Sequence, residues 1–201
     1  MCLRSRMNNE TPENNNDIIT QSSCPVCNNP LNMRWNQDNI PYFGDVMEIS
    51  SVCSCGFKYA DTLILGQREP LRYSKTVSCE RDMFTRVIRS TSGTIRIPEW
   101  GIDIEPGPAS EAYISNIEGV LDRIETVVNM AKKWSETNEE YERAECLINE
   151  IGLAREGNSS FTLVIEDPLG NSAIIDEGVE VTGLTPEEVS ALQTGMFIIE
   201  K

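Results

Sequence analysis

The sequence predicts a mainly β protein in which a small N-terminal ribbon precedes a larger β domain that carries an inserted α-helical hairpin. Three observations lead to this fold class. Two close pairs of cysteines bracket strand-like residues near the N-terminus, short β-branched runs recur at intervals of about ten residues after them, and two amphipathic segments follow in the middle of the chain. A length of 201 residues suits one or two small domains.

The charge and composition limit the possible functions. The net charge is −15, from 32 acidic and 17 basic side chains, so most of the surface would repel the phosphate backbone of a nucleic acid. We therefore do not expect nucleic acid as the main partner, and a basic protein surface is the more natural one. The chain contains no histidine, which excludes the most common general base and the Ser-His and Cys-His nucleophile pairs.

The N-terminal residues predict neither a membrane span nor an export signal. No apolar run approaches the roughly 18 residues of a transmembrane helix, and the first residues lack the apolar core of a secretory signal. Residues 1–20 are rich in Asn, Glu, Ser and Thr, which favours a disordered leader. We expect a cytoplasmic location, no membrane partner and reduced cysteines.

Four of the seven cysteines form two tight pairs, and they are the strongest signal in the sequence. Cys24 and Cys27 enclose two residues, Cys53 and Cys55 enclose one, and 25 residues separate the pairs. Two such loops, brought together by a β-hairpin, supply the four-sulfur shell that structural zinc prefers. The sequence therefore predicts one structural zinc ion per chain, since four sulfur ligands leave no open position for catalysis. The alternative is a chance pairing of buried free thiols.

The second cysteine pair is shorter than usual, because zinc knuckles commonly hold two residues between their ligands. Gly56 follows the last ligand and tolerates a positive φ, which lets backbone N–H groups turn toward sulfur; Asn28 can do the same less well after Cys27. Cys79 and Cys146 are expected to be small core residues.

Between the cysteine pairs we expect the strands of a ribbon that spans residues 21–62. Residues 33–35 and 46–52 read as strands, separated by turn-rich residues at 36–39 and 40–44, and residues 57–65 form an extended exit strand. Tyr42 and Phe43 are adjacent aromatics in the second turn. They either anchor a partner or pack under the ribbon.

The β domain is expected over residues 63–201. Strand-like runs occur at 76–79, 84–88 and 93–97, which favours a sandwich or a jelly roll. The Pro/Gly-rich residues 99–108 read as a loop. Its acidic side chains could be a paired-carboxylate site, but no other catalytic residue accompanies them, so solvated loop charges are the preferred interpretation.

A helical hairpin is predicted as an insertion at about residues 110–153. Apolar residues recur at helical spacing after Ser110, the expected N-cap of the first helix. Thr137 and Glu140 form a capping box for the second helix, and Gly152 is the expected stop. Acidic residues cluster near the connection, at Glu136, Glu139, Glu140, Glu142 and Glu145. They form either a solvated surface or a protruding acidic arm for a basic partner.

After the hairpin the β pattern returns. Residues 161–165 and 172–175 are predicted to pair as a β-hairpin, because Asp-Pro and Gly-Asn steps between them are turn chemistry. Thr185 and Pro186 predict a short helix that runs to about Gln193.

Four blocks in this order resemble the ZPR-type zinc-finger protein family, in particular its short single-module archaeal members. The blocks cover about residues 22–176 and read CPVC, IPYFGDVMEISSVCSCGFK, RVIRSTSGTIRIPEWGIDIEPGPASEAYISNIEGVLDR and FTLVIEDPLGNSAII. The resemblance implies a zinc ribbon followed by a double-stranded β-helix (jelly-roll) domain with an inserted helical hairpin. The family's zinc ligands carry over to Cys24, Cys27, Cys53 and Cys55, although the family pattern has two residues within the second knuckle.

The resemblance also implies a function. The eukaryotic relatives bear two such modules, bind the GTPase translation elongation factor one-alpha and assist its folding, so a protein-binding module or chaperone for that factor is expected here. One alternative is a zinc-ribbon adaptor for RNA or the ribosome, with a basic patch of Arg34, Lys58, Arg68 and Arg72. An enzyme of the cupin type is not expected, because those metal sites commonly use histidine, and no small-molecule substrate is predicted.

Overall fold

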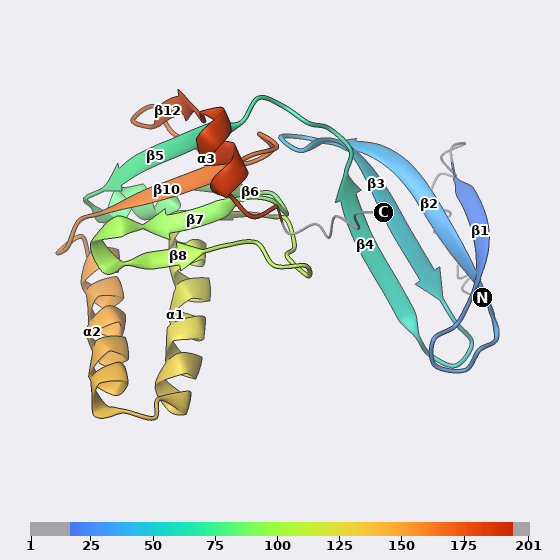
Figure 1. The fold of residues 1–201 in the computed structure, drawn as a ribbon, viewed down its shortest axis with the longest axis horizontal. Helices are drawn as coiled ribbons and strands as arrows, with labels where there is room; N and C mark the ends of the chain where they lie inside the picture. Colours follow the sequence, from blue (N-terminus) through green and yellow to red (C-terminus); the bar gives the residue numbers. More distant parts are fainter. Residues whose placement is uncertain (1–16, 195–201) are drawn as a thin grey trace, which may run out of the picture. The chain divides into compact units, whose positions relative to one another are not determined.

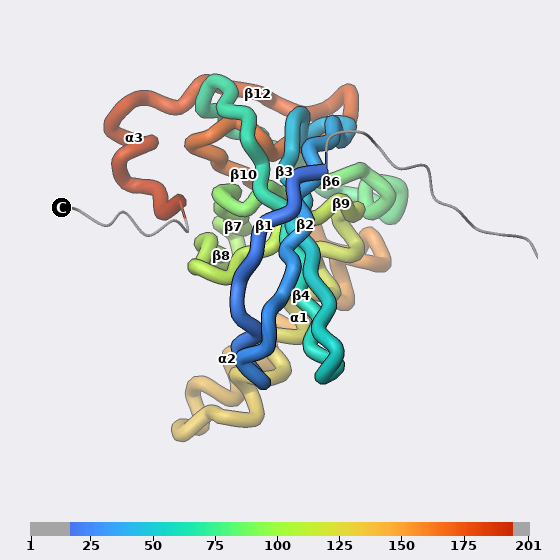
Figure 2. Tube along the Cα trace, turned by 90° about the vertical axis from the view of Figure 1, so that its right-hand side faces the viewer, coloured from blue at the N-terminus to red at the C-terminus, as the bar shows by residue number. Residues whose placement is uncertain are grey.

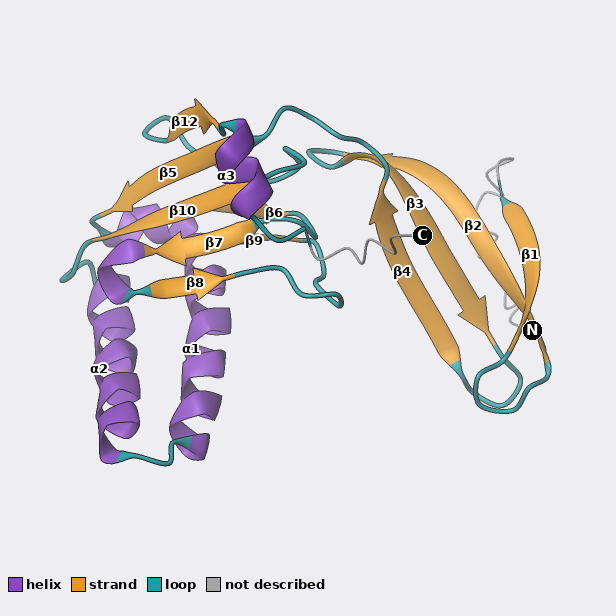
Figure 3. Cartoon of the chain, viewed as in Figure 1, coloured by secondary structure: helices purple, strands orange, loops and turns teal. Residues whose placement is uncertain are grey.

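The computed structural model describes residues 17–194, which divide into two compact units. The first unit comprises the described residues up to Ile40 together with Gly44–Leu65, and the second comprises Pro41–Phe43 and the chain from Gly66 onward. The first unit contains strands and loops, and every described helix belongs to the second (Figure 3). The mainly β fold class with a helical hairpin is confirmed.

The first unit is a four-stranded antiparallel sheet in the order β1-β2-β3-β4. The strands predicted on both sides of the ribbon turn are present and longer than expected, and the exit strand predicted at residues 57–65 is present over residues 58–64. Their bounds are β1 Ile18–Ser23, β2 Pro30–Ile40, β3 Gly44–Val52 and β4 Lys58–Ile64. Figure 1 shows these strands in sequence order across the sheet.

One expectation for this unit is wrong, and another falls mostly outside the residues that the structure describes. The turn predicted at residues 36–39 is wrong, because these residues lie in β2 and pair with β3, from Asn36 opposite Glu48 to Asn39 opposite Asp45. The chain turns at Pro41–Phe43, within the second turn predicted at residues 40–44, where Tyr42 has a φ of 77°. Most of the leader expected at residues 1–20 lies outside the described residues, and residues 18–20 lie in β1.

The second unit contains two antiparallel sheets. The larger has the order β12-β5-β10-β7-β8 and the smaller the order β11-β6-β9. Their strands are β5 Leu71–Val77, β6 Arg86–Arg89, β7 Thr94–Ile97, β8 Ile102–Ile104, β9 Tyr113–Asn116, β10 Phe161–Asp167, β11 Ala173–Ile175 and β12 Glu180–Gly183. Short 3₁₀ helices precede β6 and β8, at Glu80–Phe84 and Pro98–Trp100. Residues 99–108 were predicted to be a loop, but they contain strand β8.

The core of this unit lies between the sheets and the end of the helical hairpin that adjoins them. Alternate residues of β10, Phe161, Leu163 and Ile165, are at most 1% exposed, as expected for a strand with one face in the core. Trp100 stacks on Phe161 with their ring centroids 4.6 Å apart. The other buried members include Val77, Ile95, Ile97, Ile117, Leu121 and Ile151.

The hairpin consists of α1 (Ile117–Trp134) and α2 (Asn138–Arg155). The two helices pack side by side and project away from the sheets (Figures 1 and 2). The capping box predicted at Thr137 and Glu140 is confirmed. The start predicted at Ser110 is wrong, since residues 113–116 form β9 and Asn116 caps α1 by accepting from the Gly119 backbone at 2.8 Å. Gly152 does not end α2, which continues to Arg155.

The predicted pairing of residues 161–165 with 172–175 is also wrong. Strand β10 pairs with β5 and β7 in the larger sheet, whereas β11 pairs with β6 in the smaller one. The connection between them therefore crosses from one sheet to the other. The helix predicted after Thr185 is present as α3, Pro186–Ala191, with a capping box of Thr185 and Glu188.

The buried Asp167 carboxylate explains this crossing. Asp167 is 0% exposed and ends β10. It accepts hydrogen bonds from the hydroxyls of Ser90 and Ser92, both at 2.7 Å, and of Ser172 at 2.6 Å. The backbone N–H groups of Leu169 and Asn171 also donate to it. The carboxylate thus joins the β6–β7 loop to the chain that leads into β11.

We expect Asp167→Asn to destabilise the β domain by about 3 kcal/mol, because the amide places a donor among five donors in a buried site. Urea unfolding followed through β10 amide signals in NMR spectra measures the effect. The control is Asp103→Asn, whose side chain is 58% exposed and pairs with Arg96; it should change stability by less than about 1 kcal/mol. Equal effects of the two substitutions would contradict the role assigned to Asp167.

Candidate metal centre

The four paired cysteines lie on two loops at one end of the ribbon sheet. Cys24 and Cys27 are on the loop between β1 and β2, and Cys53 and Cys55 are on the loop between β3 and β4. The first loop closes with hydrogen bonds from the Asn28 N–H to the Cys24 carbonyl and from the Cys24 N–H to the Asn29 carbonyl, both 2.9 Å. Asn28 has a φ of 57°, which an asparagine tolerates better than most residues.

The second loop is tighter. The Cys53 N–H donates to the Phe57 carbonyl at 2.8 Å, and the Gly56 N–H donates to the Cys53 carbonyl at 3.0 Å. Gly56 has a φ of 96° with nothing within 4 Å of its missing side chain, so the backbone conformation alone accounts for the glycine. The single residue between Cys53 and Cys55 therefore does not prevent both side chains from facing the first loop.

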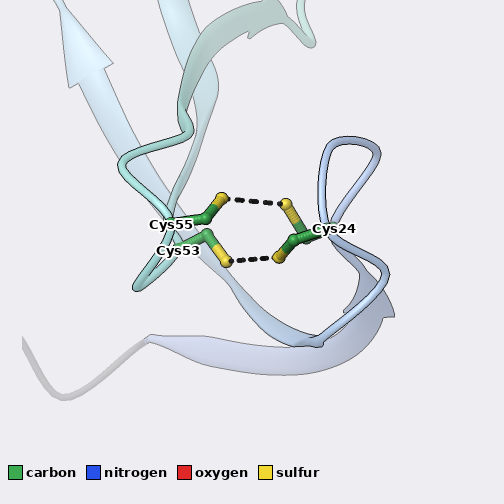
Figure 4. A group of neighbouring side chains, drawn as sticks. Cys24, Cys53 and Cys55 are labelled. Carbon is green, nitrogen blue, oxygen red and sulfur yellow. Dashed lines mark hydrogen bonds between the residues drawn. The ribbon is translucent and has the colours of Figure 1, made fainter.

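The four sulfur atoms converge on one point. All four Sγ atoms lie within 4.8 Å of one another. The Cys24 and Cys55 sulfurs are 3.7 Å apart and the Cys27 and Cys53 sulfurs 3.5 Å, so both close contacts run between the loops (Figure 4). A tetrahedral shell with Zn–S bonds of about 2.3 Å has sulfur–sulfur edges of about 3.8 Å. The donor set and its spacing fit structural zinc.

The thiols of the cluster differ in their pKa values. The Cys55 backbone lowers the pKa of Cys53, and the neighbouring thiols lower it further against the effect of burial, to about 6. The Asn29 backbone lowers the pKa of Cys27, but burial and the other thiols outweigh it and raise the pKa to about 12. Cys53 is thus the first of these two thiols to lose its proton, and a metal cation must displace the proton of Cys27 to bind it as a thiolate.

The cysteines also supply much of the ribbon's interior. The buried cluster at the loops consists of Cys24, Leu31 and Cys53, with Cys27 and Phe57 packed against it. Cys24 is 0% exposed and Cys53 6%, whereas Cys55 is exposed. Because an aliphatic core is nearly absent at this end, an ion bound by four sulfurs would contribute directly to folding.

Tyr42 and Phe43, the predicted partner contacts, differ in exposure. Tyr42 is 41% exposed, and Phe43 is buried at 7%. Only the Tyr42 ring is available to a partner. Cys79 and Cys146, expected in the core, are both exposed, so that prediction is wrong.

Two of the four residues in the basic patch predicted for RNA, Arg34 and Arg72, are paired with carboxylates. The Arg72 guanidinium pairs with Glu166 and Glu188, with N–O distances of 2.5 and 2.8 Å. These carboxylates raise the pKa of Arg72 and neutralise its charge. Arg34 lies 3.4 Å from the Asp17 carboxylate.

The end of the hairpin presents an apolar surface that sequence reasoning missed. Trp134 at the end of α1 is 76% exposed, Val127 is 59% exposed and Met130 40%. Their spacing of three and four residues places them on one face of α1, beside the stripe that faces the core. This spacing in the sequence was the signal from which the apolar surface could have been predicted. The acidic residues predicted near the connection are all exposed around it, at Glu136, Glu139, Glu140, Glu142 and Glu145.

Among the described residues, α1 and α2 are the longest helices, and neither is long and apolar enough to cross a membrane.

Known proteins give consistent similarities. A family model described as the ZPR1 jelly-roll domain matches residues 81–188, which confirms the jelly-roll expectation. The chain is 42% identical over 185 residues to an uncharacterized ZPR1-like protein of Methanocaldococcus jannaschii, covering 90% of this chain and 93% of that protein. It is 44% identical over 187 residues to a ZPR1-like protein of Pyrococcus horikoshii, covering 90% and 84%. It is 28% identical over 165 residues to a zinc finger chaperone of Schizosaccharomyces pombe, covering 78% of this chain and 36% of that protein.

We expect protein purified without added metal to carry one zinc ion per chain and Cys53→Ser to lose it, because three thiolates and a hydroxyl hold zinc less tightly. Native mass spectrometry measures the metal, and hydrogen exchange should show faster exchange in β1–β4 of the variant with β5–β12 still protected. Cys79→Ser removes an exposed thiol outside the cluster and should retain zinc. A folded, zinc-free wild type would contradict this expectation.

Proposed function

Because the chain belongs to the ZPR1 family, we propose that it is a zinc-stabilised protein-binding module that binds or chaperones the translation elongation factor one-alpha GTPase. The observation that carries the binding role is the donor set of the metal centre. Cys24, Cys27, Cys53 and Cys55 offer four sulfurs within 4.8 Å of one another, which leaves no open position on a tetrahedral ion. Such an ion supplies structural order to the ribbon and no reactive water.

The residues of the two loops would each have a part in holding the ion. The cysteines act as ligands after they lose their protons, and Cys53 is poised to do so because its pKa is about 6. Asn28 and Gly56, both at positive φ, turn the backbone after a ligand so that N–H groups point back into the loop. The result is a rigid pair of knuckles at the end of the sheet.

Two exposed surfaces suit a protein partner. Tyr42 presents its ring at the turn between β2 and β3 with 41% of its surface exposed. Trp134 is 76% exposed at the end of α1, with Val127 and Met130 on the same face. Aromatic side chains dominate binding energy at protein interfaces, and the surrounding glutamates favour a basic partner surface.

The identity of the partner rests on the family. The resemblance implies elongation factor one-alpha for relatives with two modules, and a relative from S. pombe is named a zinc finger chaperone, although this chain spans 36% of that protein's length. We extend the same partner to the single module here, in the cytoplasm where translation factors act. Fold alone does not determine function, so the partner needs a direct test.

We expect the zinc-loaded chain to capture the elongation-factor GTPase from native lysate, and Trp134→Ala to weaken binding of the purified factor at least about tenfold, because a buried interface tryptophan is a typical hot spot. Tyr42→Ala should weaken it as well. Calorimetry with the purified factor measures both. The control Phe84→Ala truncates an aromatic that is 73% exposed in the 3₁₀ helix before β6, and it should bind as the wild type does.

Failure to bind the purified factor while zinc is present would refute the proposed partner. Steeply salt-dependent binding of RNA in its place would support an RNA or ribosome adaptor.

A further inference from the structure

Two arginine side chains converge on one tyrosine of the β domain. Arg89 of β6 lies directly opposite Tyr113 of β9 in the antiparallel pairing, and its Cζ is 5.9 Å from the centre of the Tyr113 ring. The Cζ of Arg123, in α1, is 4.3 Å from the same ring centre. The ring therefore gathers two positive charges into one small region.

Within residues 17–194, neither arginine forms an ion pair. The Arg89 Nε donates to the Gly93 carbonyl at 2.9 Å and its Nη1 to the Ser110 hydroxyl at 2.9 Å, and both acceptors are neutral. The buried carboxylate of Asp167 accepts from three serine hydroxyls and two backbone N–H groups, so its lone pairs are already engaged. Guanidinium donors of the arginine pair are thus left for another acceptor.

This arrangement differs from that of three other arginines of the domain, which have carboxylate partners. Arg72 and Arg96 both pair with Glu166, and Arg155 pairs with Asp122 and Glu125. In a chain with a net charge of −15, carboxylates are abundant, yet within the described residues none forms an ion pair with Arg89 or Arg123. A cation–π contact contributes only about 0.5–2 kcal/mol and leaves the charge in place.

Arg89 carries its charge in a buried position. Arg89 is 6% exposed, and burial of an unpaired charge is unfavourable. Burial lowers the pKa of Arg89, and the nearby Arg123 charge lowers it further, although Tyr113 and Asp167 oppose the change. A bound anion would relieve both the desolvation of Arg89 and its repulsion from Arg123. Arg123 is exposed and Tyr113 is half-buried, so both are accessible to solvent.

We propose that Arg89, Arg123 and Tyr113 form a binding site for a phosphate group, either free or as a monoester. Two guanidinium groups match the charge of a phosphate dianion, and their fork of N–H donors matches its oxygens. The Tyr113 ring holds both guanidinium groups through its cation–π contacts. This site is separate from the four cysteines and goes beyond the proposed partner binding.

The test is a titration of the intact zinc-loaded chain with inorganic phosphate at constant ionic strength, followed by calorimetry and by the arginine Nε–H signals in NMR spectra. We expect saturable binding that shifts the signals of Arg89 and Arg123. Arg123→Gln should weaken it about tenfold, the loss of one charge-assisted hydrogen bond. Arg123→Lys keeps the charge but loses the fork of N–H donors. Its affinity for phosphate should lie between that of the wild type and that of Arg123→Gln. Arg123 is the site of substitution because its exposed side chain can change without unfolding the domain.

The control is Arg86→Gln, an exposed arginine on the same strand as Arg89 that makes the same change in net charge. It should bind phosphate as the wild type does. Equal weakening in the control, no saturable binding, or acetate that binds as well as phosphate would each overturn the proposal. Glycerol phosphate distinguishes the two sources: binding equal to that of inorganic phosphate assigns the site to phosphate monoesters, and binding of inorganic phosphate alone assigns it to the free ion.

Discussion

The hydrogen bonds to the Asp167 carboxylate fix the path of the chain through the β domain. The carboxylate is fully buried and is reached by side chains from the β6–β7 loop and from the residue that precedes β11. A buried carboxylate is stable only when donors replace its water, so these segments must meet at the end of β10. That meeting sends β10 into one sheet and β11 into the other. The core packed between the sheets, with Phe161, Leu163 and Ile165, depends on it.

The ribbon unit depends on a different interaction, because it has little apolar interior at the cysteine loops. Its buried cluster there contains Leu31 and two cysteines, whereas the β domain buries more than a dozen apolar side chains. A small sheet with so little buried area gains little from the hydrophobic effect, so four metal–sulfur bonds would take over the role of a core. The two units are thus stabilised by different physical means, one by sulfur ligation and one by packing around a polar anchor.

Features that depend on local chemistry could be predicted from the sequence. The cysteine loops and the caps at Thr137 and Thr185 follow from residue types at fixed short spacings, and the structure places them as expected. Features that depend on long-range strand pairing could not be predicted from the sequence. Ile114 and Ile117 fit one helical stripe, yet Ile114 lies in β9, because pairing with β6 outweighs a weak local preference. The turn residues after Asp167 were recognised, but turn chemistry does not specify which sheet receives the next strand. Burial of single residues, such as Phe43 or the exposed Cys79, likewise depends on distant packing.

The hairpin is anchored at one end and free at the other, and this asymmetry separates its structural part from the part that is open to partners. The buried residues of α1, which are Ile117, Val120, Leu121 and Ile124, all lie in its first half, where the helix contacts the sheets. Val127, Met130 and Trp134 continue the apolar pattern along the second half but remain exposed. These three side chains are not part of the buried core, so they do not stabilise the fold by packing. Several exposed apolar side chains on one helix face, bordered by glutamates, are typical of a surface that a partner covers. The acidic border then orients a basic partner while the tryptophan supplies the contact energy, which a solvated acidic surface alone does not offer.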